Sequence, residues 1–138
     1  MNWECIFDYV GSIYPTSNRP KEAASTLKHR PGSLILGEFT DCSSLPVDLR
    51  SLQTHMQKAA KLMGAHAVQS VFHKFNPYGL SGVVVIKESH FAIHTWPEYN
   101  YAAVDLFSCG KMRHAIGFKY LAKIFGSKKL RVTKVKRG

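Results

Sequence analysis

Apolar and polar residues alternate along much of the chain with the two-residue period of β-strands, whose successive side chains point to opposite faces of a sheet. The clearest alternation is at residues 90–96, where Phe91, Ile93 and Thr95 share one face. Turn-forming Gly, Pro, Asn and Ser residues separate the runs. The predicted strands are residues 33–40, 67–75, 82–87, 90–96, 101–108 and 130–135.

Two further segments have the three-to-four-residue apolar spacing of amphipathic helices. They are residues 47–63, which end at Gly64, and residues 111–125, which end at Gly126. The resulting order is strand, helix, four strands, helix and strand, and the run of consecutive strands favours antiparallel pairing. We therefore expect an α+β fold, a two-layer sandwich in which an antiparallel sheet carries its helices on one face.

The length of 138 residues suits one domain with a hydrophobic core and is too short for two of ordinary size. Residues 1–31 contain three prolines and no sustained period, so we expect an irregular N-terminal extension before a single domain at residues 32–138. The longest apolar run, residues 82–86, is far shorter than the roughly 18 to 20 residues of a membrane-spanning helix. The N-terminus does not resemble a secretory signal, so the expected location is cytoplasmic, without a membrane partner.

The formal net charge of +10 arises entirely at the C-terminal end of the chain. Residues 1–110 hold nine basic and nine acidic residues, whereas residues 111–138 hold ten basic residues and no acidic one. Such a run is typical of one solvated face of a strand, and nucleic-acid binding is the rival interpretation. Residues 79–82 resemble a GxxG loop but lack its flanking helices, so a nucleic-acid-binding module remains only the more remote alternative.

Common catalytic motifs are absent: the chain has no GxSxG, HExxH, GxxxxGK[ST] or GxGxxG. The three cysteines form no CxxC, so neither a disulfide framework nor a zinc ribbon is expected. His90 and His94 would lie about 13 Å apart in an extended strand, which argues against a shared metal ion. A nucleophilic pair of Cys109 with His94 on a neighbouring strand remains an open alternative without a local signature.

The tripeptide Glu88-Ser89-His90 lies between two predicted strands and suggests a different chemistry. A serine hydroxyl held at a strained turn can attack the preceding carbonyl and cause an N-to-O acyl shift. Elimination of the resulting ester would split the chain between Glu88 and Ser89 and leave a dehydroalanine that hydrolyses to a pyruvoyl group. The chain would thereby make a carbonyl cofactor from its own serine.

Four stretches of the chain form one specific pattern. They are residues 72–86 (FHKFNPYGLSGVVVI), 88–90 (ESH), 93–98 (IHTWPE) and 101–110 (YAAVDLFSCG). Together they resemble the prokaryotic S-adenosylmethionine decarboxylase proenzyme family, and the resemblance extends over about residues 32–135. It implies the fold of that family and a self-cleaved chain.

The resemblance also implies roles for individual residues. Ser89 is the self-processing serine and pyruvoyl precursor, and Glu88 becomes the end of the first fragment. Ser81 and His94 assist processing, which suits their chemistry because a hydroxyl can stabilise the cleavage intermediate and an imidazole can remove a proton. Cys109 is the proton donor after carbon dioxide leaves.

For the substrate site, the resemblance implies that Phe75 stacks on adenine and that Glu98 is a binding carboxylate. The pyruvoyl ketone would form a Schiff base with the substrate amine and act as the electron sink, with no metal and no external cofactor. The implied reaction converts S-adenosylmethionine to decarboxylated S-adenosylmethionine, the aminopropyl donor for spermidine biosynthesis. The implied assembly is a homodimer of processed protomers, with helices outside the sheets and residues of both protomers lining each site.

Some alternatives remain open at this level. Members of the same family have shifted to arginine or ornithine, so a pyruvoyl-dependent decarboxylase of either amino acid is the alternative function. Lys87, Asn100 and Leu34 depart from the residues expected at their positions. Trp96 is interpreted as a core or sheet-surface aromatic residue, and His73 as either a packing residue or a site residue.

Overall fold

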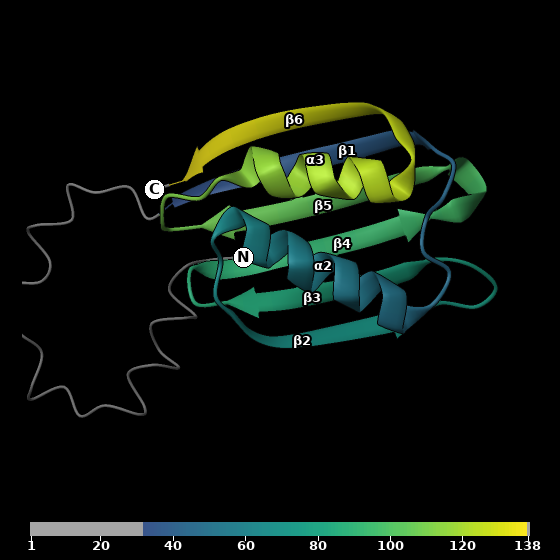
Figure 1. The fold of residues 1–138 in the computed structure, drawn as a ribbon, viewed down its shortest axis with the longest axis horizontal. Helices are drawn as coiled ribbons and strands as arrows, with labels where there is room; N and C mark the ends of the chain where they lie inside the picture. Colours follow the sequence, from purple (N-terminus) through teal and green to yellow (C-terminus); the bar gives the residue numbers. More distant parts are fainter. Residues whose placement is uncertain (1–31, 138) are drawn as a thin grey trace, which may run out of the picture.

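Six strands pair in one antiparallel sheet in the computed structural model, which describes residues 32–137 (Figure 1). The order across the sheet is β2-β3-β4-β5-β1-β6. The elements are β1 (Gly32–Cys42), α2 (Leu49–Met63), β2 (Ala67–Lys74), β3 (Leu80–Ile86), β4 (Ser89–Trp96), the 3-10 turn η2 (Pro97–Tyr99), β5 (Tyr101–Ser108), α3 (His114–Phe125) and β6 (Ser127–Arg137). The expected N-terminal extension, residues 1–31, lies outside the described residues.

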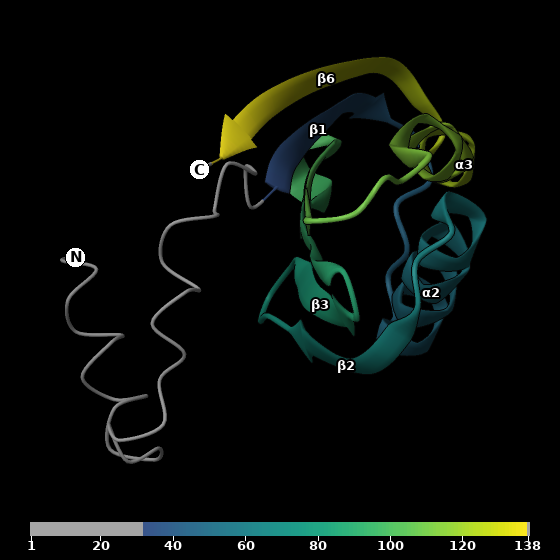
Figure 2. The ribbon, with the colours of Figure 1, turned by 90° about the vertical axis from the view of Figure 1, so that its left-hand side faces the viewer.

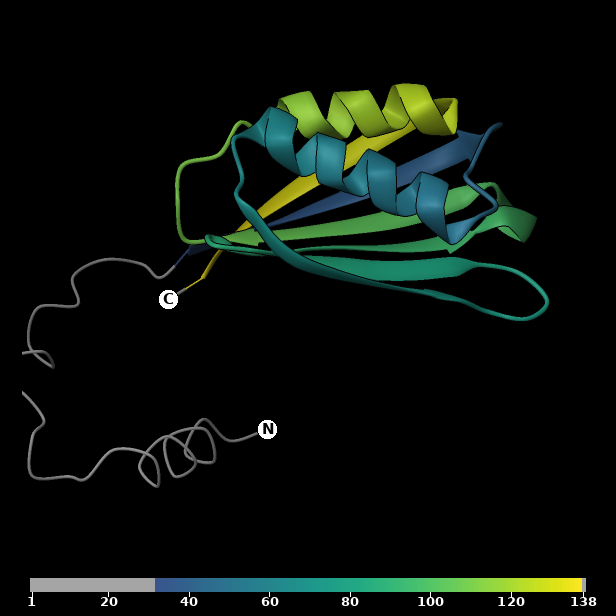
Figure 3. The ribbon, with the colours of Figure 1, turned by 60° about the horizontal axis from the view of Figure 1, so that its bottom comes forward.

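The predicted fold class is confirmed, because α2 and α3 lie side by side on the same face of the sheet (Figure 3). Figure 2, an end-on view, shows this two-layer arrangement and the bend of β6 around the edge of the sheet. The last strand is longer than the predicted residues 130–135, because β6 pairs with β1 from Ser127 to Arg137. Within residues 32–137, no helix is long and apolar enough to cross a membrane.

Helix ends follow from local chemistry. The side chain of Asp48 accepts a hydrogen bond from the backbone N–H of Ser51 at 2.8 Å and caps the start of α2. Gly64 and Gly126 end the two helices with positive φ angles of 85° and 59°, which glycine adopts without a Cβ clash. The predicted C-terminal ends of both helices are therefore confirmed, whereas the helices begin at Leu49 and His114, later than the predicted residues 47 and 111.

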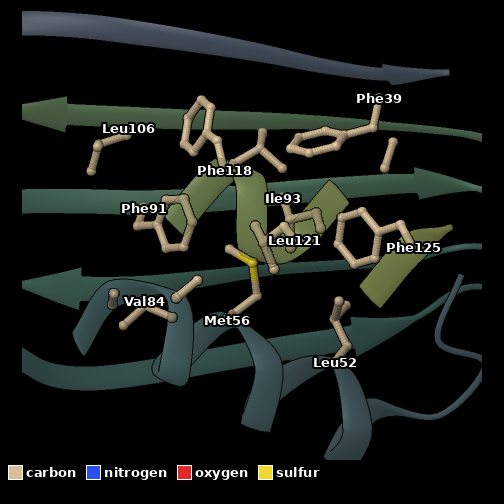
Figure 4. Packing of buried hydrophobic residues seen from close by; sticks show 14 of the residues in the cluster. Phe39, Leu52, Met56, Val84, Phe91, Ile93, Leu106, Phe118, Leu121 and Phe125 are labelled. Atoms are coloured by element: carbon tan, nitrogen blue, oxygen red, sulfur yellow. The ribbon is translucent and has the colours of Figure 1, made fainter. Parts of the chain in front are cut away.

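The core fills the space between the helices and the sheet (Figure 4). Phe39 of β1 packs edge-on against Phe125 of α3, with ring centroids 5.4 Å apart. Met56 of α2 lies between the helices and the central strands, close to Ile93 and Leu121 in the same view. Burial of these side chains on a single face of the sheet provides the main favourable term in folding.

No helix of residues 32–137 lies over the opposite face of the sheet, and we refer to this face as the open face. Phe91, Ile93 and Thr95 of β4 are buried toward the helices, as the alternation predicts, so the other side chains of β4 point to the open face. Those side chains are His90, Ala92, His94 and Trp96. The sheet therefore presents polar and aromatic groups on a surface that the described part of the chain leaves uncovered.

Candidate active site

A two-residue turn, Lys87 and Glu88, joins β3 to β4, because Ile86 pairs directly with Ser89. Ser89 has a φ of 148°, a conformation that side chains of L-residues rarely adopt. The sequence predicts a strained turn at this serine, and the backbone has that strain. The Oγ of Ser89 lies 3.4 Å from Nδ1 of His90, the next residue of β4.

The carbonyl oxygen of Glu88, which belongs to the Glu88–Ser89 peptide bond, accepts two hydrogen bonds from Cys109. The backbone N–H of Cys109 donates at 3.1 Å and its Sγ donates at 3.2 Å. Cys109 comes directly after β5, whose last residue, Ser108, pairs with Ser89. Two donors on one carbonyl oxygen are suited to stabilise negative charge if that carbonyl is attacked.

The side chain of Glu88 is bound by His66, which precedes β2. Nδ1 of His66 lies 2.7 Å from one carboxylate oxygen, and the backbone N–H of His66 donates to the other at 3.2 Å. These hydrogen bonds, the side-chain one foremost, hold the pKa of the Glu88 carboxyl below its ordinary value. His66 was not among the predicted site residues, because only the pairing register of β2 with β3 places it beside this turn.

A second group of side chains lies at the other end of β4. Ser81 of β3 and His94 of β4 are register partners, and Oγ of Ser81 lies 2.7 Å from Nδ1 of His94. The buried hydroxyl of Thr95 donates to the carbonyl of Leu80 and accepts from its N–H, which fixes the same two strands beside the pair. The two polar side chains are thus held by a rigid part of the sheet.

The Ser81–His94 pair lines an open pocket of about 270 Å³. Its lining residues are Phe75, Tyr78, Gly79, Ser81, His94, Thr95, Trp96 and Glu98. Phe75 is 49% exposed, so the ring is available to a ligand. His73 lies outside this lining, but its ring meets that of Phe75 edge-on with centroids 4.7 Å apart, so it supports the aromatic edge of the pocket.

The predicted site residues therefore fall into two groups at opposite ends of the sheet, left and right in Figure 1. Ser89 and His94 are five residues apart on one strand, which corresponds to roughly 16 Å at about 3.3 Å per residue. Within one chain, the structure does not bring His94 or Ser81 to Ser89. The two groups are therefore separate within one chain.

The alternative nucleophilic pair of Cys109 and His94 is wrong for one chain. His94 pairs with Ala103, six residues before Cys109, because antiparallel pairing of β4 with β5 sets Cys109 beside the start of β4. The register decides which residues of neighbouring strands lie opposite each other, and the sequence pattern alone does not reveal it. Among residues 32–137, no three His, Cys, Asp or Glu side chains form a set that could hold a metal ion.

The fold is similar to that of a solved decarboxylase. A structure of adenosylmethionine decarboxylase from Aquifex aeolicus superposes with a TM-score of 0.69 and 27% sequence identity, over 79% of this chain and 92% of that chain. This similarity defines the architecture as that of an adenosylmethionine decarboxylase.

The sequence comparisons assign the family. The family model described as S-adenosylmethionine decarboxylase matches residues 33–138. Over 109 residues, 78% of this chain, the S-adenosylmethionine decarboxylase proenzymes of Fervidobacterium nodosum and Thermosipho melanesiensis are 51% and 50% identical to it, and the matches cover 80% and 84% of those proteins. The chain belongs to the S-adenosylmethionine decarboxylase family, as its sequence motifs predict.

Proposed function

We propose that this chain is a self-processing, pyruvoyl-dependent decarboxylase that converts S-adenosylmethionine to decarboxylated S-adenosylmethionine, the aminopropyl donor for spermidine biosynthesis. Family membership and the proenzyme names of its relatives support the proposal. The observation that carries it is the pair of Cys109 donors on the carbonyl oxygen of Glu88, next to a serine with strained backbone.

Self-cleavage begins at this carbonyl. Oγ of Ser89 adds to the carbonyl carbon of Glu88, and the two Cys109 donors stabilise the negative oxygen that forms. The C–N bond then breaks, the nitrogen of residue 89 takes up a proton, and Glu88 is left as an ester on the serine oxygen. Strain at Ser89 favours this step, because a residue held in a rare backbone conformation lies above its relaxed free energy.

Elimination completes the cleavage. A base removes the Cα proton of residue 89, the Cβ–O bond breaks, and Glu88 leaves as a free carboxylate. The dehydroalanine that remains tautomerises to an imine, and water hydrolyses it to a pyruvoyl group with release of ammonia. His94, whose ring is held by Ser81, has the imidazole chemistry required of the base.

A homodimer would bring the two groups of site residues together. If two chains pack open face to open face with opposite ends aligned, the partner's Ser81 and His94 lie beside Ser89. The open face has apolar surface for this contact, because Val71 and Val85 of the pairing strands β2 and β3 are 59% and 41% exposed. The helices would then lie outside the paired sheets, and each site would use residues of both chains.

The pocket favours S-adenosylmethionine over arginine or ornithine. The exposed ring of Phe75 offers a flat apolar surface on which adenine can stack, and Glu98 adds a carboxylate to the same pocket. Arginine and ornithine have no aromatic ring to use this surface. Stacking of a nucleobase on an aromatic side chain contributes about 1–3 kcal/mol, enough to decide between such substrates.

The pyruvoyl group, once formed, supplies the carbonyl that condenses with the substrate amine and accepts the electrons left by carbon dioxide. Cys109 has a second role at this stage. Cleavage releases the Glu88 carbonyl from its thiol, so Sγ of Cys109 becomes free beside residue 89 to donate a proton to the substrate carbon.

An intact-mass spectrum of the purified protein tests the proposal, together with carbon dioxide release from S-adenosylmethionine, arginine and ornithine. We expect two fragments, residues 1–88 and 89–138, the second beginning with a pyruvoyl group, and the highest rate with S-adenosylmethionine. Ser89→Ala is the matched control, and we expect it to remain one inactive chain. Cleavage of that variant, or an uncleaved wild-type chain, would contradict the proposal.

A further inference from the structure

One histidine joins the start of β2 to the turn that is cleaved. His66 makes three hydrogen bonds to this two-residue turn: its carbonyl accepts from the backbone N–H of Lys87 at 2.9 Å, its Nδ1 lies 2.7 Å from Oε1 of Glu88, and its backbone N–H donates to Oε2 at 3.2 Å. Among the described residues, His66 provides both hydrogen bonds that this carboxylate receives. The turn is therefore bound through both of its residues.

The turn is held from two opposite sides. Cys109, at the end of β5, binds the carbonyl oxygen of Glu88, whereas His66, at the edge-strand side, binds its carboxylate. Rotation of Glu88 that would move its carbonyl away from the Cys109 donors must also break the contacts with His66. The strained φ of Ser89 would relax by the same motion, and the contacts with His66 oppose that relaxation.

Besides holding the turn in place, the contact of His66 with Glu88 acts on the charge of the Glu88 carboxylate. The carboxylate belongs to the same residue as the carbonyl that becomes negative during attack, and like charges repel. With its Nδ1 protonated, the imidazole donates to Oε1 of Glu88 and would compensate part of this charge when a second negative charge develops close by. The Glu88 side chain is only 20% exposed, so water compensates it less than it would a free glutamate.

We propose that His66 is a positioning residue for self-cleavage, which holds Glu88 so that its carbonyl faces Ser89 and the Cys109 donors. The inference rests on the proposed function. His66 acts through Glu88 and touches neither the attacking hydroxyl nor the pocket that lies at the other end of β4. It therefore controls the rate of maturation, whereas decarboxylation by chains that are already cleaved does not depend on it.

Cell-free synthesis of the full chain, with cleavage followed over time by gel and intact mass, tests this inference. Loss of a hydrogen bond to a charged group predicts cleavage of His66→Ala about tenfold slower than wild type. His66→Asn should restore much of the rate, because its side-chain amide can donate from the position of Nδ1. Lys61→Ala, an exposed change in the last turn of α2, is the matched control and should cleave at the wild-type rate.

Three further readouts separate positioning from a general structural effect. The decarboxylation rate per cleaved chain should be the same in wild type, His66→Ala and His66→Asn. Cleavage of the double variant His66→Ala with Glu88→Ala should be no slower than that of Glu88→Ala alone, because the histidine acts through that side chain. The ring is 68% exposed, so the thermal unfolding midpoint should change little.

Several outcomes would overturn the inference. The first is cleavage of His66→Ala at the wild-type rate, and the second is cleavage of His66→Asn as slow as that of His66→Ala. The third is slower cleavage of the double variant than of Glu88→Ala alone. The fourth is a loss of decarboxylation rate per cleaved chain in His66→Ala as large as its loss of cleavage rate. Failure of the proposed function is distinguishable, because it appears in the wild-type sample as an uncleaved chain. Normal wild-type cleavage together with unaffected His66→Ala would overturn the positioning role and leave the proposed function intact.

Discussion

Sγ of Cys109 donates to the carbonyl oxygen of Glu88 at 3.2 Å, so the thiol proposed to protonate the product is bound to the scissile peptide before cleavage. Cys109→Ala retains the backbone N–H donor and removes the thiol. We expect it to cleave more slowly but to completion, and to decarboxylate about 10²- to 10⁴-fold more slowly per cleaved chain, the range of general acid catalysis. Single-turnover carbon dioxide release measures this loss, and full turnover would exclude Cys109 as the proton donor.

The separation of Ser89 from His94 along β4 predicts complementation between two inactive variants. Ser89→Ala keeps His94, and His94→Ala keeps Ser89. In a mixed dimer, one site would combine the intact Ser89 of one chain with the partner's His94. Co-expression of the two variants with different tags should therefore give cleavage of the His94→Ala chain at a rate that this variant does not reach alone.

Two controls make the complementation decisive. Ser89→Ala co-expressed with the double variant Ser89→Ala/His94→Ala should give no cleavage, because neither chain carries the serine. His94→Ala expressed alone should stay largely intact. If the mixed sample cleaves no better than His94→Ala alone, His94 does not act on the serine of a partner, and the proposed pairing of open faces is wrong.

Phe75 provides a prediction on substrate choice. Phe75→Leu keeps an apolar side chain but removes the ring. Loss of one stacked base, worth roughly 1–3 kcal/mol, should lower kcat/KM for S-adenosylmethionine by about 5- to 150-fold. The activity assay on cleaved protein measures this change. Tyr99→Leu is the matched control, since Tyr99 is 74% exposed nearby but does not line the pocket. An unchanged kcat/KM, or faster turnover of arginine, would contradict adenine stacking at this residue.

The contact of His66 with Glu88 predicts a pH dependence of stability. Its hydrogen bonds lower the pKa of Glu88 in the folded chain below the ordinary value of 4.5. A carboxyl whose pKa is lower in the folded chain stabilises the fold at pH values above its pKa in the unfolded chain. This stabilisation is lost as the pH falls through the pKa of the folded chain. The thermal unfolding midpoints of Ser89→Ala and of Ser89→Ala/His66→Ala should differ by a small amount at neutral pH and converge at acidic pH. A constant difference down to about pH 3 would contradict the linkage.

Local sequence patterns predict the elements of this fold well. The alternation in residues 90–96 assigns Phe91, Ile93 and Thr95 to the buried face, and all three are buried. Gly64 and Gly126 end their helices because the left-handed conformation at these positions suits glycine. Such signals depend on neighbours in the chain, so they can be read from one sequence.

Long-range relationships of the site could not be predicted in the same way. The contacts of Cys109 and His66 with Glu88 bridge 21 and 22 residues and depend on the register of β4 with β5 and of β2 with β3. The division of the site residues between two ends of β4 also depends on this register. The resemblance to a family supplies residue roles, but only the pairing of strands indicates that one chain cannot bring all these residues together.

The φ of 148° at Ser89 has a consequence for the direction of maturation. A rare backbone conformation of this kind costs of order 1–3 kcal/mol because the Cβ of a tetrahedral, chiral Cα crowds the backbone. In a pyruvoyl group that carbon is trigonal, has no handedness and is preceded by no peptide, so the penalty has no counterpart. Cleavage would thus remove a conformational strain of the precursor. Rejoining the two fragments would have to restore this strain, so it is disfavoured.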